Sequence, residues 1–212
     1  MPFGFFHAGS SNGTNNSNLV VEVTSATGRI WMDRNLGAMR AATSATDYQA
    51  YGSLYQFGRG SDGHQLINWT SATAGTPVNG TTTVRSINNS PGNNLFISVI
   101  DWKNDNTYTN LWQGTSGTNN PCPDGFRVPT SQEWLDERAS WTSNNAAGAF
   151  ASPLKLPLAG YRSYNSTLFE VGTSGRYWST LANRFHIYVS GTGNPTPSDE
   201  GNGFSVRCIK DY

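Results

Sequence analysis

The sequence predicts an α+β fold in which short strands, turns and structured loops predominate over helices. Glycine, asparagine, serine and threonine are plentiful, and amphipathic helical patterns are scarce. Residues 184–189 alternate between polar-tipped and apolar side chains with a period of two, which predicts a strand. Residues 130–133 (TSQE) form a capping-box sequence, which predicts the start of a helix. Seven tryptophans supply apolar burial beyond that of the aliphatic residues.

The predicted organisation is a single domain preceded by a short arm. A chain of 212 residues can bury one sizeable core, and no shift in composition divides its interior. We therefore assign residues 19–212 to one domain and residues 1–18 to an N-terminal arm. Phe3, Phe5 and Phe6 indicate either an unpacked start or a docking contact, and the first is favoured because chain ends are commonly poorly ordered. The arm lacks the basic segment of a signal peptide, so none is predicted.

The composition argues against two classes of partner. Charged residues make up 13% of the chain and the formal net charge is +0. A basic face that neutralises nucleic-acid phosphates is therefore not expected. No apolar run approaches the roughly 20 residues that span a bilayer, so membrane insertion is not expected either.

The first predicted elements are a hairpin and a short helix. Residues 19–24 are rich in β-branched side chains, and a Thr-Gly turn joins them to a second predicted strand at residues 29–32. Asp47 is placed to cap a helix over residues 48–57. Gly52, inside that segment, disfavours the helix.

Residues 59–120 have weak periodicity and many turn-forming residues. A loop region of this length is unusual in a compact domain unless its loops are functional or held in place. We expect the scattered large apolar side chains to anchor it to the core. These are Trp69, Phe96, Trp102, Leu111 and Trp112.

The following segment contains the clearest helix. Residues 122–129 predict a turn and a short strand, and the capping box then starts a helix with Trp134 and Trp141 on its inner face. Residues 154–162 (LKLPLAGYR) are a further strand candidate, with Pro157 indicating an edge or a bulge.

Three patterns resemble catalytic motifs, but none of them supports an enzymatic function. Residues 58–63 (GRGSDG) match a dinucleotide-binding fingerprint but lack its strand, its helix and its later acidic residue. Residues 9–13 (GSSNG) match a nucleophile elbow but lie in a polar tail. Glu133, Asp136 and Glu137 are more typical of charges in the first helical turn than of paired glycosidase carboxylates.

No metal or cofactor site is predicted. His7, His64 and His186 lack the short spacings of a metal site and are expected to be ordinary histidines. His186 gains interest because its neighbours place it on an outward face. Residues 101–106 (DWKNDN) offer oxygen ligands for calcium, but their spacing does not fit an EF-hand loop. A plain turn is favoured there, with calcium as the alternative.

The segment from 175 to 208 is the predicted display surface. Its alternation places Phe185, Ile187 and Val189 toward the core and Arg184, His186 and Tyr188 toward the outside. Residues 190–203 are rich in turn formers and predict a surface loop. A second alternating run, Phe204, Val206 and Cys208, follows the loop.

The chain contains two cysteines, Cys122 and Cys208. They are too few for a zinc cluster and do not form a Cys-x-x-Cys pair. They are either a buried free pair or a disulfide. A disulfide would close a loop of about 85 residues and stabilise the fold by about 4 kcal/mol in the loop-entropy model.

Three segments in this order carry a more specific resemblance. They are residues 28–38 (GRIWMDRNLGA), residues 119–134 (NNPCPDGFRVPTSQEW), and the pair 177–179 (YWS) with 203–211 (GFSVRCIKD). Residues 54–60 (LYQFGRG) also fit. Together they resemble the Fibrobacter succinogenes major paralogous domain family, which belongs with the C-type-lectin-like and formylglycine-generating-enzyme-like folds.

The resemblance has several implications for structure and function. It implies a C-type-lectin-like fold, with a twisted antiparallel sheet, two helices, long structured loops and termini that come together. It implies that Cys122 and Cys208 form a disulfide, which leaves no cysteine for the chemistry of the enzyme branch. Some related proteins are adhesins diversified by retroelements between the Tyr-Trp-Ser and Ser-Val-Arg-Cys motifs. Here that segment is residues 180–202.

These inferences predict a receptor-binding module without catalytic activity. The expected partner is a host cell-surface glycan or protein, and the expected location is a phage tail tip, or alternatively the bacterial cell surface. Other virion proteins are expected to contact the N-terminal arm, and the chain is a candidate homotrimer. The predicted ligand-binding residues are Thr180, Leu181, Asn183, Arg184, His186, Tyr188, Ser190, Asn194, Asp199, Glu200 and Asn202. Their mixture of tyrosine, arginine and small polar residues is typical of adaptable binding surfaces.

Two alternative functions remain. A structural virion or fibre protein would bury these residues in contacts between subunits. A polysaccharide hydrolase would need two carboxyl groups in one cleft.

Overall fold

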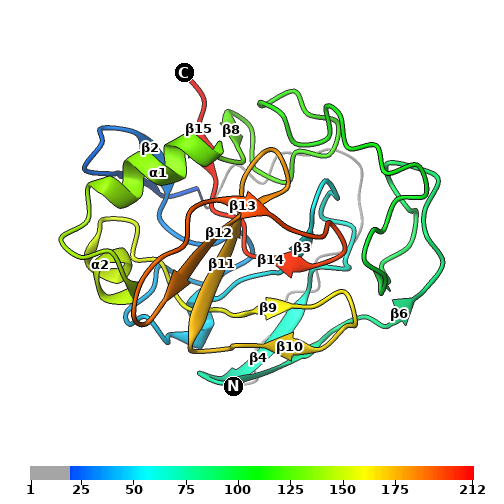
Figure 1. Ribbon diagram of the computed structural model, residues 1–212, viewed down its shortest axis with the longest axis horizontal. Coiled ribbons are helices and arrows are strands. Elements are labelled where there is room, and N and C mark those ends of the chain that lie inside the picture. The colour runs from blue at the N-terminus through cyan, green and yellow to red at the C-terminus, as the bar shows by residue number, and fades with distance from the viewer. Residues whose placement is uncertain (1–19) are drawn as a thin grey trace, which may run out of the picture.

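The structure is a computed structural model that describes residues 20–212. The predictions for the N-terminal arm, which concern residues 1–18, His7 and the GSSNG motif, lie outside the described residues. The described part of the chain has an α+β fold with short strands and two α-helices (Figure 1). None of its helices is long and apolar enough to cross a membrane.

One antiparallel sheet joins the beginning and the end of the described chain. Its strand order is β1-β2-β15-β8. The strands are β1 (Glu22–Thr24), β2 (Ile30–Met32), β15 (Ile209–Lys210) and β8 (Phe126–Arg127). The predicted hairpin is confirmed, because β1 and β2 pair in antiparallel register. The disulfide between Cys122 and Cys208 is also present, and it links the segment before β8 to the residue before β15.

Two further antiparallel sheets occupy the middle of the molecule. The first has the order β10-β9-β14-β3, and the second has the order β11-β12-β13. The first contains β10 (Leu168–Phe169), β9 (Tyr161–Arg162), β14 (Gly203–Phe204) and β3 (Tyr55–Gln56). The second contains β11 (Ser174–Trp178), β12 (Asn183–Tyr188) and β13 (Thr196–Pro197). In Figure 1, α1 (Ser131–Ala139) and α2 (Ala146–Ala151) lie on one side of the molecule, and the loops around β6 lie on the other.

The long central region forms peripheral strand pairs and loops. A hairpin of β4 (Ile67–Ser71) and β5 (Ala74–Pro77) is followed by the parallel pair β6 (Thr81–Thr82) and β7 (Phe96–Ile97). The predicted anchors hold these loops to the core. Phe96, Trp102, Leu111 and Trp112 are buried, and the half-buried Trp69 donates its indole N–H to the carbonyl of Gly52 at 2.7 Å.

The predicted helix over residues 48–57 is wrong. Asp47 does cap its start, accepting a hydrogen bond from the Gln49 N–H, but only one 3₁₀ turn, η1 (Tyr48–Ala50), forms. Gly52 then has φ +71°, where a Cβ atom would lie 2.5 Å from the carbonyl oxygen of Leu36. The chain therefore leaves the helical path and continues into β3.

The predicted strand over residues 154–162 is also largely wrong, because only Tyr161 and Arg162 form β9. Two carbonyls of the preceding residues accept hydrogen bonds from buried side chains. Arg207 donates to Leu154 at 2.6 Å, and the Tyr177 hydroxyl donates to Pro157 at 2.6 Å. The segment is an extended part of the core held by buried side chains.

The capping box is confirmed, but only one of the two tryptophans predicted on the helix lies within it. The Thr130 hydroxyl accepts from the Glu133 N–H, and the Glu133 carboxylate accepts from the Thr130 N–H, which starts α1. Trp134 is buried and its ring stacks on Phe185 with centroids 5.0 Å apart. Trp141 lies beyond the end of α1 and is half-buried at the edge of the same cluster.

One detail of the predicted display segment is corrected. Val189 was expected in the core but is 65% exposed, because β12 ends at Tyr188 and the chain turns back, with the Tyr188 N–H donating to the carbonyl of Gly191. The second alternating run is buried throughout, since Ser205 and Arg207 are as fully buried as their apolar neighbours. That segment lies inside the molecule.

Candidate binding face

Strands β11 and β12 place polar side chains together on one face of their sheet. The register pairs on this face are Ser174 with Tyr188, Arg176 with His186, and Trp178 with Arg184. At the Trp178 end this face also enters the core, because Trp178 is fully buried against Phe204. Phe185 and Ile187 take the opposite face and pack into the core. Side chains directly opposite in an antiparallel pair lie close enough to interact. The predicted alternation is therefore confirmed from 184 to 188, and β11 adds Arg176 to the polar face.

A charged cluster forms on this face. We call it the β12 cluster and define it as Glu170, Ser174, Arg176, Arg184 and His186. Arg176 Nη2 donates to Glu170 Oε1 at 2.9 Å, and Ser174 Oγ donates to Glu170 Oε2 at 2.5 Å. Although partial burial opposes it, the bond from Ser174 and the charge of Arg176 lower the pKa of Glu170. Glu170 is therefore a carboxylate that neutralises Arg176.

His186 is the most buried titratable group of the cluster, with 3% of its surface exposed. Neither ring nitrogen has a hydrogen-bond partner among the described residues, and Nε2 lies 3.5 Å from Glu170 Oε2. Burial and the nearby charge of Arg176 lower the pKa of His186 to about 4. The imidazole is thus neutral at pH 7, with its polar atoms unsatisfied.

Arg184 is half-buried and lies beside Arg176. Its Nε atom is buried without a hydrogen-bond partner among the described residues. Burial lowers the pKa of Arg184, and the positive charge of Arg176 lowers it further. The one carboxylate of the β12 cluster is already bonded to Arg176, so the guanidinium of Arg184 lacks a matching charge within the cluster.

Tyrosine rings flank the β12 cluster. The ring of Tyr188 lies against His186 with centroids 3.6 Å apart, and Tyr188 is 42% exposed. On the other side, the guanidinium of Arg176 lies over the ring of Tyr161, 3.6 Å from its centroid. Tyr188 thus connects the buried cluster to the surface.

The loop of residues 189–202 is held at its first half by the helical side of the molecule. The Arg138 guanidinium donates to the carbonyl of Gly193 at 3.2 Å and to Asn194 Oδ1 at 2.9 Å. The Thr192 hydroxyl donates to the side chain of Asn144. These bonds fix the path of the backbone and leave Ser190 and the rest of Asn194 exposed.

The second half of the loop is held by the sheets. The Gly201 N–H donates to the carbonyl of Ile100 at 2.8 Å, and the Phe57 N–H donates to the carbonyl of Glu200 at 3.1 Å. Asn202 is buried, and its Oδ1 accepts from the Tyr164 N–H at 3.0 Å. Asn202 therefore supports the loop from inside.

The predicted ligand-binding residues fall into three groups by exposure. Leu181, Tyr188, Ser190, Asn194 and Asp199 are exposed. Asn183, Arg184 and Glu200 are half-buried, whereas Thr180, His186 and Asn202 are buried. Arg184, His186 and Tyr188 meet on β12, while Asp199 and Glu200 lie on the part of the loop next to Ile100 and Phe57. The expected exposure of Thr180, His186 and Asn202 is therefore wrong.

Thr180 is buried because its backbone lies between two other segments. Its N–H donates to the carbonyl of Pro129 at 3.0 Å, and its carbonyl accepts from Gln113 Nε2 at 2.9 Å. Asn183 is also held, since its Nδ2 donates to the Ser131 hydroxyl at 3.0 Å. The start of the display segment is thus part of the frame.

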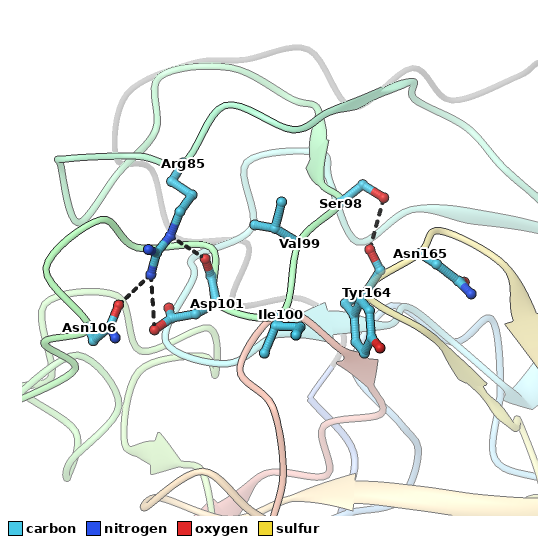
Figure 2. Close-up of a pocket in the computed structure, with 8 residues that line it drawn as sticks. All are labelled: Arg85, Ser98, Val99, Ile100, Asp101, Asn106, Tyr164 and Asn165. Carbon is cyan, nitrogen blue, oxygen red and sulfur yellow. Dashed lines mark hydrogen bonds and ion pairs between the residues drawn. The ribbon is translucent and has the colours of Figure 1, made fainter.

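A groove of about 650 Å³ adjoins the second half of the loop (Figure 2). It is lined by Arg85, Ser98, Val99, Ile100, Asp101, Asn106, Tyr164 and Asn165. Arg85 Nη2 pairs with Asp101 Oδ2 at 3.2 Å, and its Nε donates to the Asp101 carbonyl at 2.7 Å. Asp101 is the only carboxylate of this lining, and it is paired.

The groove and three members of the β12 cluster, Glu170, Ser174 and Arg176, were not among the predicted site residues. The period-two pattern extended back into β11 would have placed Arg176 beside His186. No local pattern marks Glu170 or the groove, because both depend on segments brought together by the fold.

The glycine-rich fingerprint at 58–63 is a structural turn, as expected. Arg59 is buried, and its guanidinium pairs with Asp62 at 2.5 Å. His64 Nε2 accepts from the Gln56 N–H at 3.0 Å, and its Nδ1 lies 2.5 Å from Asp62 Oδ1. Every polar atom of His64 is thus used within the protein.

The acidic residues of α1 and the turn at 101–106 also have structural partners. Glu133 pairs with Arg127 at 2.7 Å, and Asp136 accepts from Gln132 Nε2 at 2.8 Å. Glu137 is buried, which raises its pKa, and its Oε1 accepts from Trp141 Nε1 at 3.3 Å. The side chain of Asp101 accepts from the Lys103 N–H and from the Tyr108 hydroxyl. No group of three His, Cys, Asp or Glu side chains among residues 20–212 is placed to hold a metal ion.

Comparison of the chain with protein-family models, with curated proteins and with solved structures finds no match. The site therefore rests on its own geometry.

Proposed function

We propose that this chain is a non-enzymatic receptor-binding module, with its binding face formed by β12 and the loop of residues 189–202. One observation carries the proposal: an exposed loop with a fixed backbone borders a cluster in which Arg184 and His186 have unsatisfied polar atoms. Buried polar groups are normally hydrogen-bonded, and those that are not invite an explanation. A ligand that supplies the missing partners is the explanation we adopt.

A C-type-lectin-like frame is the fold that we propose to hold this face. Three features support it: the first and last described strands share one sheet, the loops are long and pinned, and a disulfide joins Cys122 to Cys208. These features agree with what the resemblance to the Fibrobacter succinogenes major paralogous domain family implies. In such a frame, residues 180–202 correspond to the segment that retroelements diversify.

The exposed side chains suit adaptable recognition. Tyr188 offers a rigid aromatic ring, and Ser190, Asn194 and Asp199 offer hydrogen-bonding groups on an anchored backbone. Aromatic anchors with small polar neighbours give affinity at a low cost in conformational entropy. We propose that the partner is a glycan or a protein on a bacterial surface, and that the module belongs to a phage tail tip or to a cell-surface adhesin.

A whole-cell binding assay tests this function. The labelled chain is incubated with a panel of bacterial strains, and binding is compared with that of the double variant Arg184→Ala, Tyr188→Ala. We expect the double variant to lose about tenfold or more in apparent affinity, because aromatic and arginine anchors dominate most interfaces. The control is Met39→Ala, an exposed residue outside the face. Equal cell binding by the wild type and the double variant would sink the proposal.

A structural fibre protein is the second candidate, and one observation favours it. Val84 and Ile87 are 74% and 75% exposed on the loops between β6 and β7. Exposed apolar side chains that gather into one patch mark contacts between subunits. A trimer by light scattering that dissociates on Val84→Ser, Ile87→Ser, together with no binding to cells, would favour this candidate.

A further inference from the structure

The charges of the β12 cluster do not balance. Arg176 and Arg184 each carry a positive charge, Glu170 carries the one negative charge, and His186 is neutral at pH 7. Glu170 is bonded to Arg176 and Ser174. The cluster therefore has an excess of one positive charge, located on Arg184. A partly buried charge is costly unless an opposite charge pairs with it.

Unsatisfied hydrogen-bonding atoms lie at the same place. The Nε atoms of Arg176 and Arg184 and both ring nitrogens of His186 are buried without hydrogen-bond partners in the described part of the chain. His186 is more than nine-tenths buried, and its side chain lies on the same face of the sheet as both arginines. A guanidinium with free N–H donors is the protein group best suited to bind a planar carboxylate with two bonds. Charge and hydrogen-bonding capacity thus point to the same kind of ligand.

The surroundings of the cluster suit a sugar ring next to that anion. Tyr188 lies against His186 and exposes 42% of its surface, so an aromatic ring adjoins the β12 cluster at the surface. A uronic or sialic acid holds a carboxylate and a ring at a fixed distance, and it loses little conformational freedom on binding. A glutamate side chain of a protein would lose more, because its carboxylate is carried on a flexible stem.

We propose that the half-buried guanidinium of Arg184 binds the carboxylate of an acidic sugar of a surface polysaccharide, with the sugar ring against Tyr188. This rests on the proposed function and names the ligand class of that face. Glu170 limits the site to a single negative charge, because it already neutralises Arg176 and belongs to the same cluster. Removing the charge of Glu170 is therefore expected to strengthen binding, and removing the charge of Arg184 to weaken it.

Calorimetry with the full chain at pH 7 tests the ligand class. The probes are oligosaccharides of galacturonate, glucuronate and N-acetylneuraminate, each with its methyl ester, and a trimer of glutamate. We expect at least one acidic oligosaccharide to bind saturably and its ester to bind about tenfold to a hundredfold more weakly, as the loss of a charged hydrogen bond implies. If none of the three acids binds, or if the glutamate trimer binds as well as they do, the proposal is overturned.

Charge variants give the second test. Arg184→Gln is expected to weaken binding of the acidic oligosaccharide about tenfold or more, and Glu170→Gln to strengthen it several-fold, because an arginine–carboxylate bond is charge-assisted. Lys155→Gln is the control, since it removes an exposed positive charge that forms no ion pair among the described residues. Thermal unfolding confirms that each variant folds. Equal affinities of Arg184→Gln and Lys155→Gln would overturn the proposal.

The cell assay separates failure of this inference from failure of the proposed function. If cells bind the chain through Arg184 and Tyr188 but no acidic oligosaccharide binds, the receptor-binding function stands and the acidic sugar is wrong. If an acidic oligosaccharide binds and no strain does, the sugar site stands and the receptor-binding function is wrong.

Discussion

Some buried polar side chains find all their hydrogen-bond partners within the protein, and others do not. Arg207 is fully buried, and its guanidinium donates to Asn35 Oδ1 and to the carbonyls of Met32 and Leu154. Arg184 is half-buried, and its Nε has no hydrogen-bond partner among the described residues. Since both residues belong to the same protein, this contrast separates an arginine that supports the frame from one that is available to a ligand.

The first residue-scale prediction concerns His64 and pH. Burial and the charge of Arg59 lower the pKa of His64 from 6.5 to about 4, and its Nε2 already accepts from the Gln56 N–H. The folded pKa lies below the unfolded value, so the unfolded state binds a proton first as the pH falls. The contribution of His64 to the free energy of unfolding is therefore complete above pH 6.5 and is lost as the pH falls toward 4. We expect urea unfolding to show a loss of about 3 kcal/mol from this group over that range.

The variant His64→Gln is the comparison for this experiment. Glutamine offers an acceptor for the Gln56 N–H but does not titrate, so the stability of the variant should depend less on pH between 6.5 and 4. A variant whose stability falls as steeply as that of the wild type would show that His64 is not the group responsible.

Elements with a complete local pattern were predictable, and elements shaped by distant contacts were not. The capping box fixed the start of α1 because both of its hydrogen bonds lie within four residues. The hairpin of β1 and β2 has a similarly local turn. The helix expected from residue 48 does not form, because Gly52 adopts a positive φ. It packs there against the carbonyl of Leu36, which is distant in the sequence. No periodicity reports such a contact.

The start of α1 gives an element-scale prediction. Thr130→Ala removes the side-chain acceptor of the Glu133 N–H and is expected to lower the free energy of unfolding by about 1 kcal/mol. Thr130→Ser keeps the hydroxyl and should stay within a few tenths of a kcal/mol of the wild type. Chemical unfolding of both variants measures the difference. An equal loss in both would mean that the methyl group, rather than the cap, supplies the stability.

The disulfide gives a second prediction at this scale. Cys122 and Cys208 are separated by 86 positions and link the segment before β8 to β15. Closing a loop of this length stabilises a fold by about 4 kcal/mol in the loop-entropy model. Urea unfolding with and without a reductant should show a loss of this size, and the variant Cys122→Ser, Cys208→Ser should not respond to reductant. An unchanged midpoint in the reduced wild type would contradict the expectation.

In the whole molecule, the candidate face arises from segments that are far apart in sequence. The polar alternation of β12 could be predicted, because a period of two is visible within six residues. Arg176 joins it through the register of β11, and Glu170 joins it from the turn before that strand. The burial of His186 and Asn202 could not be predicted, because it depends on what packs over them. The sequence therefore indicates the strand, and the fold determines which of its residues are accessible.

At the scale of the molecule, the stability of the fold is expected to be independent of the exposed side chains of the loop of residues 189–202. Ser190, Asn194 and Asp199 are exposed, while the backbone around them is held by bonds to Arg138 and to the carbonyl of Ile100. Changing all three residues to Ala should alter the free energy of unfolding by less than about 1 kcal/mol, since surface substitutions usually have small effects on stability. Thermal unfolding checks this, and a loss of several kcal/mol would show that the loop side chains belong to the frame.

Hydrogen exchange on ligand binding tests the binding face most directly. The full chain is measured alone and with an envelope extract of a strain that it binds. We predict that new protection is concentrated in residues 183–202, because β12 and the anchored loop contact the ligand there. Protection confined to residues 78–106, or no change within 183–202, would contradict the proposed face.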